Sequence, residues 1–227
     1  MKKFLFAASL FFTVCIANAQ QLSQVRLSQG LTLNFIAFIT DQGVLIRMSD
    51  DGKILEYGME VKSARYEFYA PQLQPFTGRI DYYGAEADSL SKGKLKSIGT
   101  CAITYYGPLE TEERRGKIRT LGTLLFDYFP QYEHVSLKGK MKSAGSTLFS
   151  FYGPFENEAY RGKLKSIGNN TLTYHSSFDD KMVRGKIKSA GSTNFIWNTS
   201  LEPGNIGGSL KNGNYRQTVA GVTYILN

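Results

Sequence analysis

The stretch RGKLKSIGNNTLTY at residues 161–174 decides the fold, because the chain repeats it at a fixed interval. The next copy, at residues 184–197, reads RGKIKSAGSTNFIW, and the copy before it, at residues 138–151, reads KGKMKSAGSTLFSF. Gly-Lys pairs stand at the same place in five consecutive copies, at Gly93, Gly116, Gly139, Gly162 and Gly185. A fixed period of roughly 20–50 residues is typical of repeat architectures. We therefore expect one structural unit to recur along most of the chain.

The first half of each copy predicts a β-strand with one basic and one apolar face. In the stretch 160–166, Lys or Arg stands at every second position, and Gly162, Leu164 and Ser166 alternate with these basic residues. A period of two places successive side chains on opposite faces of a strand. We therefore expect Leu164 and Ser166 on one face and the basic side chains on the other.

A turn and a second strand complete the copy. Gly168 stands where the chain reverses, and we expect it to adopt positive φ, which costs glycine little. The same is expected of its equivalents Gly99, Gly122, Gly145 and Gly191. The second strand is predicted at Thr171–His175, with Leu172 and Tyr174 on one face. A closing stretch, such as GPLETEE at 107–113, then turns the chain with Gly or Pro, an apolar residue and carboxylates.

Two strands per copy predict an all-β fold, a repetitive antiparallel meander that forms a single twisted sheet of 23-residue hairpins. The regular array spans residues 93–227 and includes a degenerate sixth copy at Gly208. Looser copies at Gly52 and Gly78 lie in an irregular β portion, residues 20–92. We expect the strands of this portion to start and cap the array.

The period of 23, the glycine spacing and the closing GSLKNG at 208–213 resemble MORN repeats. Tyr160-Arg161-Gly162-Lys163-Leu164 follows that family's Tyr-x-Gly pattern, while the next glycine, Gly168, comes one residue later than in the family. The resemblance covers about 135 residues, from 93 to 227. It implies β-hairpins in a single twisted sheet, with roles in scaffolding and in contact with membranes or other proteins.

The alternative architecture is a β-solenoid, in which each 23-residue copy makes one coil. Equivalent lysines would then stack about 4.8 Å apart, and like charges directly opposed on neighbouring strands are destabilising. In a meander a second strand lies between equivalent positions, which doubles the spacing to roughly 9.6 Å. Physiological salt screens much of the repulsion at that distance, so the charge pattern favours the meander.

Residues 1–19 predict a secretory signal peptide. Lys2 and Lys3 precede the apolar stretch 4–16, and Ala17-Asn18-Ala19 fits a small-x-small cleavage site. We expect the mature protein to be exported, whether to the periplasm, the cell surface or the medium. No later stretch has the ~18 consecutive apolar residues of a membrane span. Cys101 would be the one cysteine of the mature chain, which excludes an intrachain disulfide.

Two basic columns run along the array. The first consists of the Lys that follows the glycine of each Gly-Lys pair, and the second of the Lys or Arg two residues later. Together they carry much of the formal net charge of +8. A cationic sheet face can bind an anionic polysaccharide or lipid headgroup, and it can equally be a solvated face that discourages edge-to-edge aggregation. Exposed tyrosines beside the lysines would favour binding, whereas carboxylates folded over the lysines would favour a scaffold. The candidate polyanion-binding residues are Lys94, Lys96, Lys117, Arg119, Lys140, Lys142, Lys163, Lys165, Lys186, Lys188, Tyr106 and Tyr152.

Aromatic residues also recur with the period. A repeat core needs rings that pack on their neighbours along the array, so we expect the column Tyr105, Tyr128, Phe151, Tyr174 and Trp197 to be buried; a stacking platform for sugars is the alternative. Tyr106, Phe129 and Tyr152 follow these rings directly and are expected on the opposite face, beside the lysines.

The sequence offers little for catalysis. His134 and His175 fall in different columns of the repeat without metal-ligand spacing, and the nucleophile motif G-x-S-x-G is absent from the sequence. The many carboxylates sit in turns that are repeated for structural reasons. We therefore expect a non-catalytic protein without cofactor or metal.

Two functions follow from these observations. The first is a scaffold or interaction module of the cell envelope that contacts an envelope protein. The second is a module that binds anionic glycan or lipid headgroups through the basic face. Nucleic acid is a poor candidate because of the predicted export and because the sequence contains no motif that reads RNA or DNA.

Overall fold

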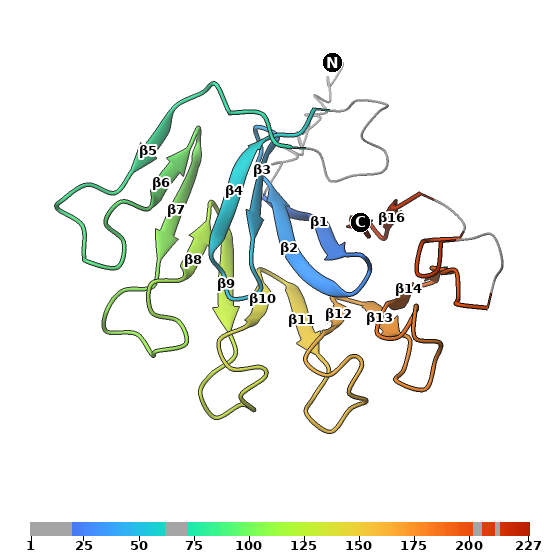
Figure 1. Ribbon diagram of the computed structural model, residues 1–227. Helices are drawn as coiled ribbons and strands as arrows, with labels where there is room; N and C mark the ends of the chain where they lie inside the picture. The colour runs from blue at the N-terminus through green and yellow to red at the C-terminus, as the bar shows by residue number, and fades with distance from the viewer. Residues whose placement is uncertain (1–19, 62–71, 202–205, 212–213) are drawn as a thin grey trace, which may run out of the picture.

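A computed structural model describes residues 20–61, 72–201, 206–211 and 214–227, which form two β-sheets and, within these ranges, no helix (Figure 1). The predicted signal peptide, residues 1–19, lies outside the described residues. The all-β class expected from the period-two pattern is confirmed.

Eleven strands form one long antiparallel sheet in sequence order, so that each strand pairs with the strands before and after it. Neighbouring copies therefore meet through an intervening strand, which confirms the meander and excludes the solenoid. The strands are β5 (Ile80–Tyr82), β6 (Leu95–Ile98), β7 (Cys101–Tyr105), β8 (Ile118–Leu121), β9 (Leu124–Tyr128), β10 (Met141–Ala144), β11 (Thr147–Phe151), β12 (Leu164–Ile167), β13 (Asn170–Tyr174), β14 (Ile187–Ala190) and β15 (Thr193–Asn194).

The hairpin turns follow the sequence prediction. In the β12–β13 hairpin, Ile167 pairs with Asn170, and Gly168 has a φ of 54°. Glycine at the first central position of a two-residue loop is the preference of a type II′ turn, whose twist matches that of the strands. The equivalents have φ of 56° (Gly99), 56° (Gly122), 58° (Gly145) and 53° (Gly191), which confirms the predicted positive φ at all five glycines.

The first strand of each copy differs from the prediction in length and in the faces of its side chains. The strand begins at Leu164, and residues 160–163 belong to the preceding turn, where Gly162 has a φ of 73°. Ser150 pairs with Ser166 and Phe151 with Leu164, so Lys165 is an extra residue in a β-bulge. Leu164 and Ile167 are therefore the buried residues of the strand, and the expectation that Ser166 shares a face with Leu164 is wrong.

The same bulge recurs wherever two copies meet. At each junction one residue of the copy's first strand has no partner on the opposite strand. At the first junction, Asp81 and Tyr82 pair with the residues on either side of the unpaired one, and the same register shift recurs along the array. The extra residues are Lys96, Arg119, Lys142, Lys165 and Lys188, which make up the second basic column. A strict period of two cannot reveal this, because a bulge shifts the alternation by one residue.

Six strands form a second sheet in the order β16-β17-β1-β2-β3-β4. They are β1 (Gln21–Ser28), β2 (Thr32–Ile39), β3 (Val44–Met48), β4 (Ile54–Met59), β16 (Arg216–Val219) and β17 (Val222–Ile225). All pairs are antiparallel except β1 with β17, which are parallel and join the two ends of the described chain. The strands after residue 211 thus belong to this sheet, whereas β5, before residue 93, belongs to the long one.

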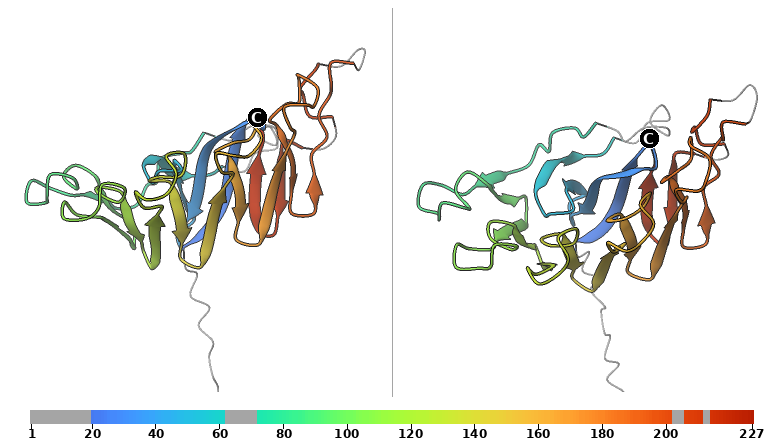
Figure 2. Two further views of the ribbon diagram at one scale, coloured as in Figure 1. Left: turned by 90° about the horizontal axis from the view of Figure 1, so that it is seen from below. Right: turned by 60° about the horizontal axis from the view of Figure 1, so that its bottom comes forward.

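The six-stranded sheet packs against one face of the long sheet, which curves around it in Figures 1 and 2. One cluster of buried side chains holds residues from both sheets, including Phe38 of β2 and Phe126 of β9. These two rings meet edge to face with their centroids 5.1 Å apart. The strands β1–β4 therefore cover the array, which gives the hairpins a closed core that a lone sheet lacks.

Two hairpin turns of the smaller sheet lie directly on the aromatic column of the array. At Gly30 an added Cβ atom would lie 2.4 Å from the ring of Trp197, and at Gly52 it would lie 2.1 Å from the hydroxyl of Tyr128. The carbonyl of Gly30 accepts a 2.7 Å hydrogen bond from the backbone N–H of Ile187, beside a bulge. A side chain larger than hydrogen at either glycine would separate the two sheets.

Candidate functional site

The first basic column lies within the array rather than on an open face. Each lysine is half-buried or buried, and its Nζ donates a hydrogen bond to a backbone carbonyl. In the first four the acceptor is the glycine 22 residues further on; the distance is 2.9 Å from Lys140 to Gly162 and 2.5 Å from Lys163 to Gly185. The column consists of Lys94, Lys117, Lys140, Lys163 and Lys186, the last of which bonds to Gln29 of the smaller sheet.

Each of these lysines also lies over the ring of the aromatic column in its own copy, with Nζ 4.5–5.3 Å from the ring centroid. Burial lowers the pKa of Lys94, Lys117 and Lys186 below the ordinary value of 10.5. Burial and the charge of Lys186 lower the pKa of Lys163 to about 8. The first column therefore connects consecutive copies, and its charges are turned inward.

The rings beneath the first column form the expected core. Tyr128, Phe151, Tyr174 and Trp197 are buried, and Tyr105 is half-buried. The three tyrosines and Trp197 each donate a hydrogen bond to the backbone carbonyl ten residues earlier; the Tyr128 hydroxyl, for example, donates to the Ile118 carbonyl at 2.9 Å. The prediction that this column is core rather than a stacking platform is confirmed.

The second basic column lies on the outer face of the long sheet, at the bulges. Its members Lys96, Arg119, Lys142 and Lys188 are exposed, and Lys165 is half-buried with its Nζ 3.5 Å from Glu156. Three of these cations lie over a tyrosine ring: Lys96 over Tyr83, Arg119 over Tyr106 and Lys165 over Tyr152, at 5.8, 5.9 and 5.2 Å from the centroid. This column, unlike the first, can reach a ligand outside the chain.

Tyr106 and Tyr152 lie beside the second column but do not form an open surface. Tyr106 is 8% exposed, and its hydroxyl donates to the carbonyl of Phe126 at 2.7 Å. Tyr152 is half-buried, and its hydroxyl donates to Leu172 at 2.8 Å. The expectation that Tyr106 stands exposed among the lysines is therefore wrong, because each hydroxyl reaches a carbonyl of the next copy.

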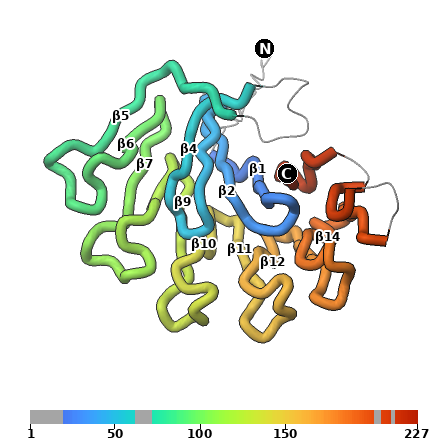
Figure 3. The backbone as a smooth tube through the Cα atoms, viewed as in Figure 1, coloured from blue at the N-terminus to red at the C-terminus, as the bar shows by residue number. Residues whose placement is uncertain are grey.

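The loops between copies project from one edge of the long sheet and carry the apolar residues of the closing stretches, whose exposure the sequence did not show (Figure 3). At the same position of five successive loops an apolar side chain points into solvent. The exposed fractions are 100% for Leu109, 83% for Tyr132, 100% for Phe155, 92% for Phe178 and 86% for Leu201. Successive members are separated by the same interval as the glycines of the repeat. We call these five residues the loop tips, and the edge that carries them the loop edge.

Four of the loop tips, Leu109, Tyr132, Phe155 and Phe178, are held by turns whose backbone bonds do not use the tip side chain. In the loop of Phe155, the N–H of Glu156 donates to the carbonyl of Gly153. Asn157 then accepts from the N–H of Ala159 at 3.0 Å, and its own carbonyl accepts from the N–H of Arg161. Backbone bonds of the same kind occur in the loops of Leu109, Tyr132 and Phe178. The tip side chain takes no part in these bonds.

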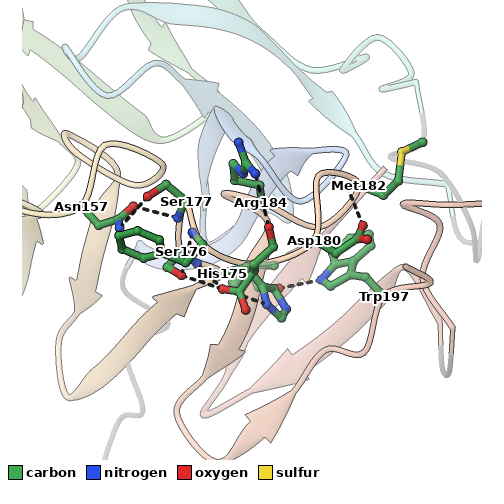
Figure 4. Close-up of polar contacts among 11 residues, drawn as sticks. Asn157, His175, Ser176, Ser177, Asp180, Met182, Arg184 and Trp197 are labelled. Carbon is green, nitrogen blue, oxygen red and sulfur yellow. Dashed lines mark hydrogen bonds and ion pairs between the residues drawn. The ribbon is translucent and has the colours of Figure 1, made fainter. Parts of the chain in front are cut away.

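Neighbouring loops are also bonded to one another. Asn157 donates to the hydroxyl of Ser177 in the next loop and accepts from its N–H, both at 3.0 Å (Figure 4). Asp180 accepts from the N–H of Ser200 at 3.1 Å, one loop further on. Lys138 lies 3.3 Å from the carboxylate of Glu113. These contacts fix the distance between successive loop tips.

Both histidines make contacts within the chain. His134 accepts from the N–H of Ser136 at 3.2 Å, and His175 lies 3.7 Å from Asp179, with its pKa lowered by burial. Burial also raises the pKa of the Cys101 thiol to about 11, which leaves it unreactive at neutral pH. Within the described ranges, no three His, Cys, Asp or Glu residues are grouped to hold a metal ion.

A hollow of about 440 Å³ opens where the edges of the two sheets diverge. Tyr57 and Tyr105 line it from opposite sheets, together with Tyr82 and Lys94. The Tyr57 and Tyr82 hydroxyls bond to each other, and Lys94 bonds to Gly116. These polar atoms are already paired within the chain, so the hollow makes a weaker candidate site than the loop edge.

Comparisons with known proteins add no family. No family model, curated protein or solved structure matches this chain, so no comparison supports the resemblance to MORN repeats. In the part of the chain that the structure describes, no helix has the length and apolar character needed to cross a membrane.

Proposed function

We propose that this protein is an exported, non-catalytic interaction module of the cell envelope, a scaffold that engages its partner through the loop edge. The observation that carries the proposal is the column of loop tips, which recur once in each copy and are 83–100% exposed. Export rests on the signal-peptide pattern of residues 1–19.

Three other repeated features of a copy have a use within the chain. The glycines supply positive φ, the first lysine column binds carbonyls, and the rings fill the core. The loop tips contribute to none of these. Apolar side chains that are exposed singly are common on soluble proteins, whereas apolar side chains gathered on one surface mark contact sites. Repetition of an exposed Leu, Tyr or Phe therefore supports a partner outside the chain.

The proposal is tested by photo-crosslinking in producing cells. Benzoylphenylalanine replaces Phe155 at the loop edge in one variant and Thr171, an exposed strand residue on the outer face, in the other. We expect discrete crosslinked products from position 155 that position 171 does not give. Equal yields from the two positions, or no product from either, would reject the loop edge as the contact surface.

The exposed second basic column supports a second candidate function, the binding of an anionic glycan or lipid headgroup. Counterion release would make such binding fall steeply with salt. Two triple variants are compared for retention on heparin resin. The first changes Arg119, Lys142 and Lys188 to Gln; the control, with the same loss of charge, changes Lys92, Arg161 and Arg184 to Gln. All six are exposed. Earlier elution of the first variant alone would support the second column, and equal elution of the two would count against it.

A further inference from the structure

The spacing of the loop tips restricts what can fit against them. Successive tips are one copy, or two strands, apart, which corresponds to roughly 9.6 Å. An aromatic side chain inserted midway would lie about 4.8 Å from each neighbour along the column, within the roughly 4.5–7 Å range of favourable ring contacts. A partner that fills every gap needs apolar side chains with the same period. A second copy of this chain has that period.

We propose that two copies of this protein pair through their loop edges, with the loop tips of one inserted between those of the other. This inference rests on the proposed function of the loop edge and names its partner. Two-fold pairing places the same surface on both subunits, which is the commonest symmetry of soluble oligomers. The lateral bonds Asn157–Ser177 and Asp180–Ser200 hold the tips in place before pairing, which lowers the entropic cost of association.

The charge of the loops permits this pairing. The four fully described loops that carry a tip, at 107–116, 130–139, 153–162 and 176–185, hold eight Asp or Glu and six Lys or Arg, a net charge of −2 against +8 for the whole chain. Acidic and basic residues are mixed within each loop, so two loop edges face each other without a large field of one sign. The outer face, with its exposed basic column, would repel a second copy.

The same charges argue against an anionic membrane as the partner. A carboxylate directly follows each of four tips, at Glu110, Glu133, Glu156 and Asp179. Insertion of the tips among anionic headgroups would bring these carboxylates close to like charge. Membrane-surface segments instead carry Lys and Arg beside their apolar residues. A membrane is therefore an alternative outcome of the test below.

The apolar area is of the size that a dimer needs. Aromatic side chains bury about 150–250 Å² each, so the three aromatic tips can bury about 450–750 Å² on each copy. Leu109, Val135 and Met182, which are 100%, 84% and 41% exposed, add to this area on the same loops. A standard interface buries about 800 Å² per partner, so the loop edge reaches that size.

The test is the mass of the purified protein in solution by sedimentation velocity over a series of concentrations. We expect twice the mass of one chain for the parent and a single-chain mass when Tyr132, Phe155 and Phe178 are changed to Ser. Leu125→Ser with Leu148→Ser is the control: both leucines are exposed on the outer face, at 52% and 61%, and the pair of changes should leave the dimer intact. Circular dichroism confirms that each variant is folded.

A parent of single-chain mass at every concentration would overturn the inference, as would a folded tip variant that keeps the dimer. If the parent floats with anionic vesicles and the tip variant does not, the partner of the loop tips is a membrane and the inference of a second copy is rejected. The proposed function of the loop edge can be judged separately from the pairing of two copies. If position 155 crosslinks to another protein while the parent has single-chain mass, the loop edge remains a contact surface and only the second copy is rejected. Crosslinks between two copies would support both proposals.

Discussion

The bond from Lys163 to the next copy offers the sharpest test of how the array is held together. Lys163 donates to the Gly185 carbonyl at 2.5 Å and lies 5.3 Å from the centroid of the Tyr174 ring. Lys165, two residues later, is half-buried on the outer face, 3.5 Å from Glu156. Changing each lysine to Met keeps an unbranched apolar side chain and removes the charge and the donor. Lys165→Met is therefore the matched control for Lys163→Met.

The expected loss of stability follows from these contacts. A hydrogen bond from a charged donor contributes about 1.5–3 kcal/mol, and a cation over a ring adds about 0.5–1 kcal/mol at a partly exposed site. The burial that lowers the pKa of Lys163 to about 8 opposes these gains, although solvent screens part of that cost. We expect a net loss of about 1–2 kcal/mol for Lys163→Met and about 0–1 kcal/mol for Lys165→Met.

Urea denaturation at pH 7 measures the difference. Trp197 is the one tryptophan of the chain, is 4% exposed and donates its indole N–H to Ile187 at 2.6 Å, so its fluorescence reports on unfolding of the array. With a slope of about 2 kcal/mol per molar urea, the midpoint of Lys163→Met should fall by about 0.5–1 M. Equal midpoints for the two variants would refute the view that inward lysines stabilise the junctions between copies.

Three further predictions follow from the fold. Gly168→Val should lower the free energy of unfolding by about 1–3 kcal/mol through backbone strain, because φ is 54° and an added Cβ would meet nothing within 4 Å; an unchanged thermal midpoint would contradict this. Phe126→Ala should cost about 3–5 kcal/mol, because the ring is fully buried against Phe38 between the sheets; a loss below about 1 kcal/mol in urea would show that the sheets are held together elsewhere. The pKa of Lys163 is about 8 in the folded chain against an ordinary 10.5, so above pH 8 the unfolded chain binds more protons, and the free energy of unfolding should rise between pH 8 and 9.5 in the parent relative to Lys163→Met. Parallel pH profiles for the two proteins would rule out that titration.

The hairpins could be predicted from the sequence because their signals are local. Gly168 stands at a turn whose φ few other residues adopt, and Leu172 and Tyr174 mark the inner face of β13 by their spacing. The charge pattern favoured the meander over the solenoid for a reason that also lies within one copy and its neighbours, and the observed strand pairing excluded the solenoid. The bulge at Lys165 could not be predicted, because one extra residue leaves the composition of the strand unchanged and alters only its register.

The candidate site required the tertiary structure. Lys163 and Lys165 look alike in the sequence, yet one faces a carbonyl of the next copy and the other faces the outer surface. Phe155 and Phe151 are equally apolar, yet one is fully exposed and the other is 7% exposed. An apolar residue in a sequence is expected to be buried, so an exposed row of such residues is recognised only when the loops are placed in space.

The repeat period, the strand pairing within each copy and the glycine turns were determined by local residue patterns, since backbone sterics and side-chain alternation act over a few residues. The second sheet was decided by contacts between distant segments: β1 pairs with β17, from Val25 to Tyr224, across nearly the whole described chain. No periodicity connects those strands. They meet because the open face of the array exposes apolar side chains, and the chain ends supply the strands that bury them.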